Sequence, residues 1–93
     1  MNYIKFNDLT CQVVSFNKYT NFDENGMSGS CNCQIITDDI TALQALGLET
    51  ITSLQIIHDE DIIYNLQNIS AKMTSINEYL ADNHIDINLT LTF

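Results

Sequence analysis

Apolar and polar residues alternate along much of this chain, and a period of two indicates β-strands with one buried face. The clearest alternation lies at residues 85–93, IDINLTLTF, where every second position from Ile85 to Phe93 is large and apolar. A slip of one residue would bring this whole face into water, so the register of the strand should be firmly fixed. We therefore expect the segment to be held inside a sheet, with Phe93 closing the core or an interface.

A second alternation predicts a hairpin at the N-terminus, with its turn at Asn7-Asp8. Its inward positions are apolar: Ile4, Phe6, Leu9, Cys11 and Val13. From Ser15 the phase shifts, and Val14 and Phe16 become the apolar pair. A shift of this kind predicts a bulge, or a strand that crosses between sheets.

The stretch at residues 21–30, NFDENGMSGS, holds two of the three glycines and is rich in polar residues, which predicts a loop. Beyond it Cys31, Cys33 and Ile35 alternate with polar residues. This alternation predicts a strand in which both thiols point toward the same buried face.

Residues 38–46 predict one short α-helix, because apolar residues recur there at helical spacing, at Ile40, Leu43 and Leu46. Thr37 or Asp38 would cap its start, acidic residues would lie in its first turn, and Gly47 would end it. Two β-branched runs then flank the acidic turn HDED at residues 58–61 and predict a hairpin. Its apolar faces would be Leu54 with Ile56 on the first strand, and Ile62, Tyr64 and Leu66 on the second.

Residues 68–81 allow two interpretations. Leu66, Ile69, Met73, Ile76 and Leu80 follow a helical stripe, whereas Ile69, Ala71 and Met73 alternate as in a strand. We favour a strand at residues 68–77, closed onto the last strand through a turn at residues 81–83. The sequence then predicts one domain, residues 1–93, that is mostly β: an antiparallel β-sandwich or partly open barrel of about six to seven strands with one helix. A second helix at residues 68–81 would instead make the fold α+β.

The charge balance narrows the partners that such a fold could bind. Twelve carboxylates against three lysines and no arginine give a formal net charge of −9. Nucleic acid and anionic lipid would be repelled, so we expect neither nucleic-acid nor membrane binding and favour protein partners. The N-terminus lacks a signal-peptide pattern, and no apolar run reaches membrane-spanning length, so we expect a soluble protein made in the cytoplasm.

Three features could carry chemistry, and each has a simpler structural interpretation. Cys31-x-Cys33, with Cys11, His58 and His84, could supply zinc ligands, but the spacing is that of inward thiols in a strand. No cation that would activate a thiolate lies near any cysteine in the sequence. The acidic clusters at residues 23–25, 38–39 and 59–61 could offer oxygens to calcium, but none has EF-hand spacing and each suits a turn or a helix start. We expect no catalytic, cofactor or metal site, and no enzyme.

Two segments also carry a resemblance. YIKFNDLTCQVVSF and ITSLQIIHDEDIIYNL, together with the final strand, resemble small accessory proteins encoded among the structural genes of bacteriophages and prophages. The resemblance implies a β-rich module of the tail, baseplate or head that works by self-assembly or by docking on other virion proteins. Its location would then be the virion. It assigns no functional residue, and the Cys31/Cys33 pair departs from it.

Three functional hypotheses remain. The first is a non-enzymatic structural protein, most concretely a phage-type virion component that forms a homo-oligomer or docks on virion proteins. The second is an acidic inhibitor that mimics nucleic acid in the groove of a DNA- or RNA-binding protein. The third is an enzyme or metal protein, and it rests only on the cysteines and histidines.

Overall fold

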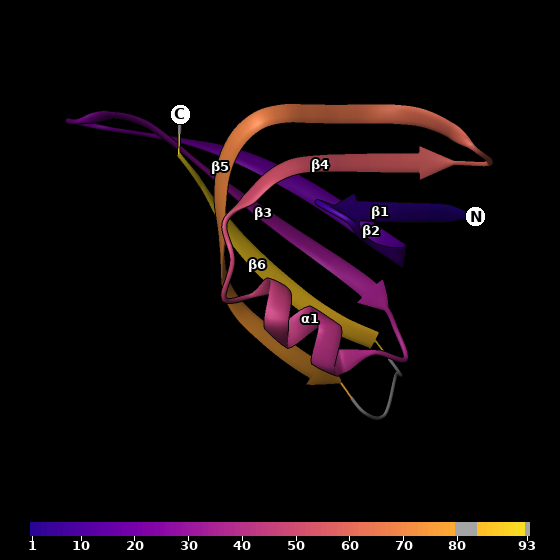
Figure 1. Ribbon diagram of the computed structural model, residues 1–93. Helices are drawn as coiled ribbons and strands as arrows, with labels where there is room; N and C mark the ends of the chain where they lie inside the picture. The colour runs from indigo at the N-terminus through magenta and orange to yellow at the C-terminus, as the bar shows by residue number, and fades with distance from the viewer. Residues whose placement is uncertain (80–83, 93) are drawn as a thin grey trace.

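The computed structural model describes residues 1–79 and 84–92 of the chain (Figure 1). These residues form six strands and one helix, in chain order β1 (Asn2–Phe6), β2 (Leu9–Asp23), β3 (Gly26–Ile36), α1 (Ile40–Leu46), β4 (Ile51–His58), β5 (Asp61–Tyr79) and β6 (His84–Thr92). Neighbouring strands are antiparallel, and the sheet closes into a barrel in the order β1-β2-β3-β6-β5-β4. The prediction of a mostly-β fold is confirmed, and the six strands are arranged as a closed barrel.

The alternative of a second helix is wrong for residues 68–79, which belong to strand β5. Strand pairing decides the outcome, because β5 pairs with β4 up to Ala71 and with β6 from Ser70 onward. The predicted turn at residues 81–83 and the closing role of Phe93 both fall outside the described residues.

The barrel interior is filled by the inward residues of the strands and by one face of the helix. Strand β6 buries its alternate residues Ile85, Ile87, Leu89 and Leu91, which confirms the pattern predicted for residues 85–91. The remaining buried apolar residues are Ile4, Phe6, Cys11, Val13, Cys31, Cys33, Ile35, Leu43, Leu46, Ile51, Leu54, Ile56 and Ala71. The core thus draws on every strand and on α1.

Two local irregularities let long strands turn across the barrel. Val14 is the extra residue of a bulge in β2, where the register with β3 shifts between Val13 and Ser15, as the phase change predicted. In β5, Asn68 adopts a φ of 56°, close to where the strand leaves β4 and joins β6. Asparagine tolerates this left-handed conformation better than most residues, so it suits a sharp bend.

A second bulge corrects one predicted strand face. The β4–β5 register shifts between Ile56 and Ile57, which leaves Ile63 as an extra residue. Ile62 then pairs with Ile57 on the outer side and is exposed, whereas Tyr64 pairs with the buried Ile56. Ile62 and Tyr64 therefore lie on opposite faces of β5. The uninterrupted alternation predicts one shared face, and that prediction is wrong.

The loop predicted at residues 21–30 is also wrong. Strand β2 continues to Asp23 and β3 begins at Gly26, so only Glu24 and Asn25 form the turn. The segment is polar because most of it is exposed, and backbone pairing between the two strands gives it regular structure all the same.

The helix begins one or two residues later than predicted. Its N-cap is Asp39, whose carboxylate accepts a hydrogen bond from the Ala42 N–H at 3.0 Å, and not Thr37 or Asp38. The predicted first-turn acids therefore precede the helix. Gly47 ends it as predicted, and its N–H donates to the Leu43 carbonyl at 3.0 Å. None of the helices described at residues 1–79 and 84–92 is long and apolar enough to cross a bilayer.

Candidate protein-docking surface

Strand β2 is longer than its neighbour β1, and this leaves a free strand edge. The β1–β2 pairing ends at Tyr3 and Gln12, whereas β2 runs on to Asp23. Within the described residues, no strand pairs with this later part of β2 on the side away from β3. We call it the open edge, residues 15–23. A free edge of backbone N–H and C=O groups is a ready template for another strand.

The same length difference makes the β2–β3 hairpin project from the barrel. Pairing of β3 with β6 reaches only Gly29 and Leu91, so the hairpin beyond that point has no third strand in the described part of the chain. We call residues 19–30 the projecting hairpin. Figure 1 shows it extending past the rest of the molecule, on the side opposite the β4–β5 turn.

The projecting hairpin continues the apolar face of the barrel core into solvent. Along β3 the buried residues Cys33, Cys31 and Gly29 alternate inward, and Met27 lies next on that face. Met27 pairs with Phe22, and these side chains are 60% and 77% exposed. An apolar pair on an exposed strand is typical of an interface, because burial would remove both side chains from water.

A groove opens beside the start of the open edge. Its volume is about 450 Å³, and it is lined by Asn2, Val13, Val14, Ser15, Phe16, Lys18, Ile56, Ile63 and Tyr64. We call it the rim groove. The bulges position two of its apolar residues, Val14 on β2 and Ile63 on β5, and both are exposed. The rings of Phe16 and Tyr64 pack across it with centroids 5.7 Å apart.

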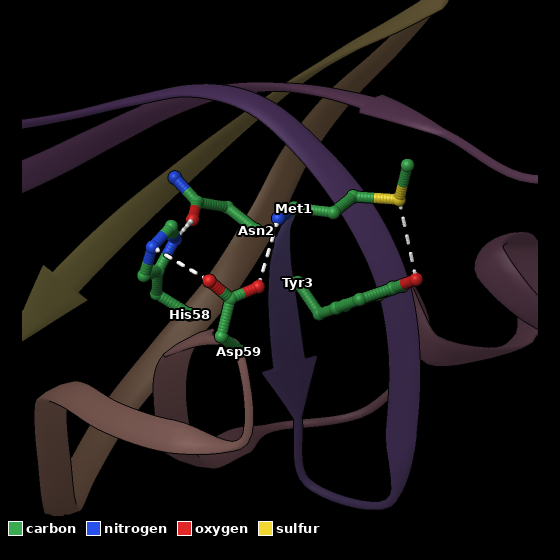
Figure 2. A network of polar contacts seen from close by, with 5 residues as sticks. All are labelled: Met1, Asn2, Tyr3, His58 and Asp59. Carbon is green, nitrogen blue, oxygen red and sulfur yellow. Dashed lines mark hydrogen bonds and ion pairs between the residues drawn. The ribbon is translucent and has the colours of Figure 1, made fainter.

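A polar network fixes the β4–β5 turn to the start of β1 (Figure 2). The Met1 ammonium donates to the Asp59 carboxylate at 3.2 Å, and His58 Nε2 lies 3.1 Å from the other carboxylate oxygen. His58 Nδ1 also contacts Asn2 Oδ1. The hydrogen bond from the ammonium, followed by the charge of His58, lowers the pKa of Asp59. The network holds a side of the groove in place while its members stay exposed.

Most of the large exposed apolar side chains lie in two separate regions. Tyr19, Phe22 and Met27 lie on the projecting hairpin, and a second group lies around the rim groove and the N-terminus: Met1, Tyr3, Val14, Ile62 and Ile63. Of the residues whose structure is described, only Leu48 and Tyr79 are large, apolar, exposed and located elsewhere. The open edge runs from the rim groove to the projecting hairpin, and we treat these three features together as the candidate docking surface.

The three cysteines lie inside the barrel as free thiols. Burial, followed by the neighbouring Cys31, Asp86 and Cys11, raises the pKa of Cys33 to about 12. Burial also raises the pKa of Cys11 and of Cys31. The inward orientation predicted for Cys31 and Cys33 is confirmed, and their thiols are protonated at neutral pH.

The histidines are not brought together with the thiols. His58 belongs to the exposed network at the β4–β5 turn, and His84 stacks on Tyr79 with ring centroids 5.0 Å apart. Across residues 1–79 and 84–92, no three His, Cys, Asp or Glu side chains are grouped so that they could hold a metal ion.

The acidic clusters lie at three separate turns. Asp23 and Glu24 are at the end of the projecting hairpin, residues 59–61 are at the β4–β5 turn, and residues 38–39 precede α1. At the hairpin turn the Asp23 carboxylate accepts a hydrogen bond from the Asn25 N–H at 2.8 Å. This contact, the Asp39 cap and the contacts of Asp59 with Met1 and His58 give each of the three clusters a structural role.

The docking surface was not apparent from the sequence interpretation, because its hairpin was assigned to a loop. The available signal was the pair Asn25-Gly26, which is typical of a hairpin turn, with Phe22 and Met27 placed symmetrically around Glu24-Asn25. The free edge was not visible, since a sequence pattern identifies a strand and its buried face without identifying its neighbours. Comparison of the chain with protein-family models, with curated proteins and with solved structures found no match in any of the three.

Proposed function

We propose that this protein is a non-enzymatic assembly protein that acts by self-assembly or by docking on other proteins, most concretely as a component of a phage-type virion. One observation carries the proposal: strand β2 leaves the barrel with a free edge and presents Phe22, paired with Met27, to solvent. Both features lower the solubility of a monomer, because free strand edges and exposed apolar pairs promote association.

The rest of the surface supports a protein partner. The rim groove adds apolar side chains next to the open edge, so a single partner could contact both. A net charge of −9 disfavours nucleic acid and anionic lipid at the same surface. The virion assignment adds the resemblance of the two hairpin segments to accessory proteins of phages and prophages.

Particle association tests the proposal. The protein is tagged, the particles released by the source culture are separated on a density gradient, and each fraction is probed for the tag. We expect the protein to sediment with the particles, and Phe22→Ser to reduce its share by at least tenfold. Leu48→Ser is the matched control, because Leu48 is a large exposed apolar residue of the α1–β4 connection, away from the hairpin. Absence of the wild-type protein from every particle fraction would contradict the virion assignment.

A further inference from the structure

We infer that Asn25, in the turn of the projecting hairpin, is a site of spontaneous chemical modification, at which the folded protein loses ammonia and converts the asparagine to aspartate and isoaspartate. This chemistry goes beyond the proposed function and does not depend on it. The backbone nitrogen of Gly26 is the nucleophile, and water is the only other reactant.

The reaction has two steps. After hydroxide removes its proton, the Gly26 nitrogen attacks the side-chain carbon Cγ of Asn25. A bond between this nitrogen and Cγ forms, the bond from Cγ to Nδ2 breaks, and Nδ2 takes a proton from water and leaves as ammonia. Water then opens the cyclic imide: cleavage at Cγ gives aspartate, and cleavage at the Asn25 backbone carbonyl gives isoaspartate. One water is consumed for each ammonia released, and nothing is oxidised or reduced.

The residue after Asn25 favours this attack. Asn25 is the only asparagine of the sequence that precedes a glycine. A side chain on the following residue would crowd the approach of its backbone nitrogen to Cγ, and glycine has none. Gly26 also has a φ of 118°, a conformation that glycine adopts far more readily than other residues.

The turn is open to solvent and weakly held. Asn25 is exposed, and within residues 1–79 and 84–92 its side-chain amide makes no hydrogen bond, although its backbone N–H donates to the Asp23 carboxylate at 2.8 Å. Pairing of β3 with β6 stops at Gly29, so two strands alone carry the turn in this part of the structure. A two-stranded hairpin is marginally stable in water. The turn can therefore open locally, without unfolding of the barrel, and bring the Gly26 nitrogen to Cγ.

Asn7, in the turn between β1 and β2, shows the opposite arrangement. Its Oδ1 accepts hydrogen bonds from the backbone N–H groups of Thr52 at 3.0 Å and Ser53 at 3.3 Å. Its Nδ2 donates to the Thr50 carbonyl at 3.2 Å. These contacts hold the amide on β4, so it cannot rotate freely toward the next backbone nitrogen. Asn7 is therefore the internal control for an asparagine in a hairpin turn.

Modification of Asn25 would change the charge and the backbone of the projecting hairpin. Either product adds one negative charge beside Asp23 and Glu24, in a chain of net charge −9. Isoaspartate also carries the chain through Cγ and so lengthens the backbone by one carbon. The pairing of Phe22 with Met27 next to the turn would then shift, and the candidate docking surface would change with it.

Peptide mapping by mass spectrometry tests the inference. The purified folded protein is incubated in mildly alkaline buffer, digested at intervals, and fragmented to locate each converted asparagine. We expect Asn25 to convert at least tenfold faster than Asn7, with isoaspartate among the products, detected by enzymatic methylation. Asn25→Gln keeps an amide at this position but would need a larger ring, so conversion there should fall at least tenfold. Circular dichroism verifies that the variant is folded.

The same incubation in urea separates the effect of the fold from that of the sequence. Unfolding releases the Asn7 amide, so its conversion should rise at least tenfold, whereas that of the already exposed Asn25 should change less than threefold. An Asn25 that stays intact in the folded protein, or that converts there no faster than Asn7, would overturn the inference. Both outcomes are independent of particle association, which tests the proposed function alone.

Discussion

Phe22 and Met27 lie directly opposite each other at the end of the β2–β3 hairpin, on the face that forms the barrel core farther along the same strands. The pair contributes little to the fold, because neither side chain is buried. We expect Phe22→Ser and Met27→Ser to change the free energy of unfolding by no more than about 0.5 kcal/mol, as is usual for surface substitutions. Urea unfolding measures this directly. A loss of several kcal/mol would mean that the pair belongs to the core and not to a docking surface.

Leu91 provides the opposite case, because it is buried in β6 between Gly29 on β3 and Ala71 on β5. Leu91→Ala should lower the free energy of unfolding by about 2–5 kcal/mol, the usual cost of such a truncation in a packed core. Thr92→Ala is the control, since Thr92 is exposed on the same strand and should change stability little. Equal unfolding midpoints for the two variants would contradict the role of β6 as a core strand.

The β4–β5 turn carries backbone strain that substitution should relieve. Asp59 and Glu60 both have positive φ, 47° and 75°, and Glu60 lacks the short polar side chain that eases this conformation. Glu60→Gly should raise the free energy of unfolding by up to about 1 kcal/mol, after allowance for the greater freedom of glycine in the unfolded chain. Glu60→Gln removes the charge but keeps the backbone strain, so it should raise the free energy of unfolding by less than Glu60→Gly does. If the two variants are equally stable, relief of charge repulsion and not of backbone strain explains the gain.

Cys33 should make stability depend on pH in the alkaline range. Its folded pKa of about 12 lies above the ordinary value of 9.0, so the folded state holds the proton more tightly than the unfolded state. The protonated Cys33 thiol makes its full contribution to the free energy of unfolding below pH 9. This contribution is lost as the pH rises toward 12, at up to about 1.4 kcal/mol per pH unit. In urea unfolding over this range, the free energy of unfolding of the wild type should therefore fall toward that of Cys33→Ala, which has no thiol at this position to ionise. Parallel curves would show that the thiol does not couple folding to pH.

Hydrophobic alternation predicted the strands where one face is buried and the other is wet. The apolar positions of residues 85–91 and the bulge at Val14 followed from it, and Gly47 identified the end of the helix. Period two indicates which residues point inward, because burial selects apolar residues at those positions. This period does not identify the neighbouring strands, so it could not predict that pairing of β1 with β4 closes the barrel.

Where burial does not select the residues, the same reasoning failed. Residues 21–30 pair regularly but lie mostly in water, so their composition resembles that of a loop. The bulge at Ile63 reversed the face of Ile62, because one extra residue shifts every position before it relative to those after it. Both errors fall in the candidate docking surface, where packing in the barrel core does not determine the residue types.

Site-specific photo-cross-linking through position 22 tests most directly whether the projecting hairpin docks on protein. A photoreactive phenylalanine analogue replaces Phe22 in one version of the protein and Leu48 in the control, and both are irradiated in the cells that produce the particles. The account predicts protein adducts from position 22 and none from position 48. Equal yields from the two positions, or no adduct from position 22, would contradict it.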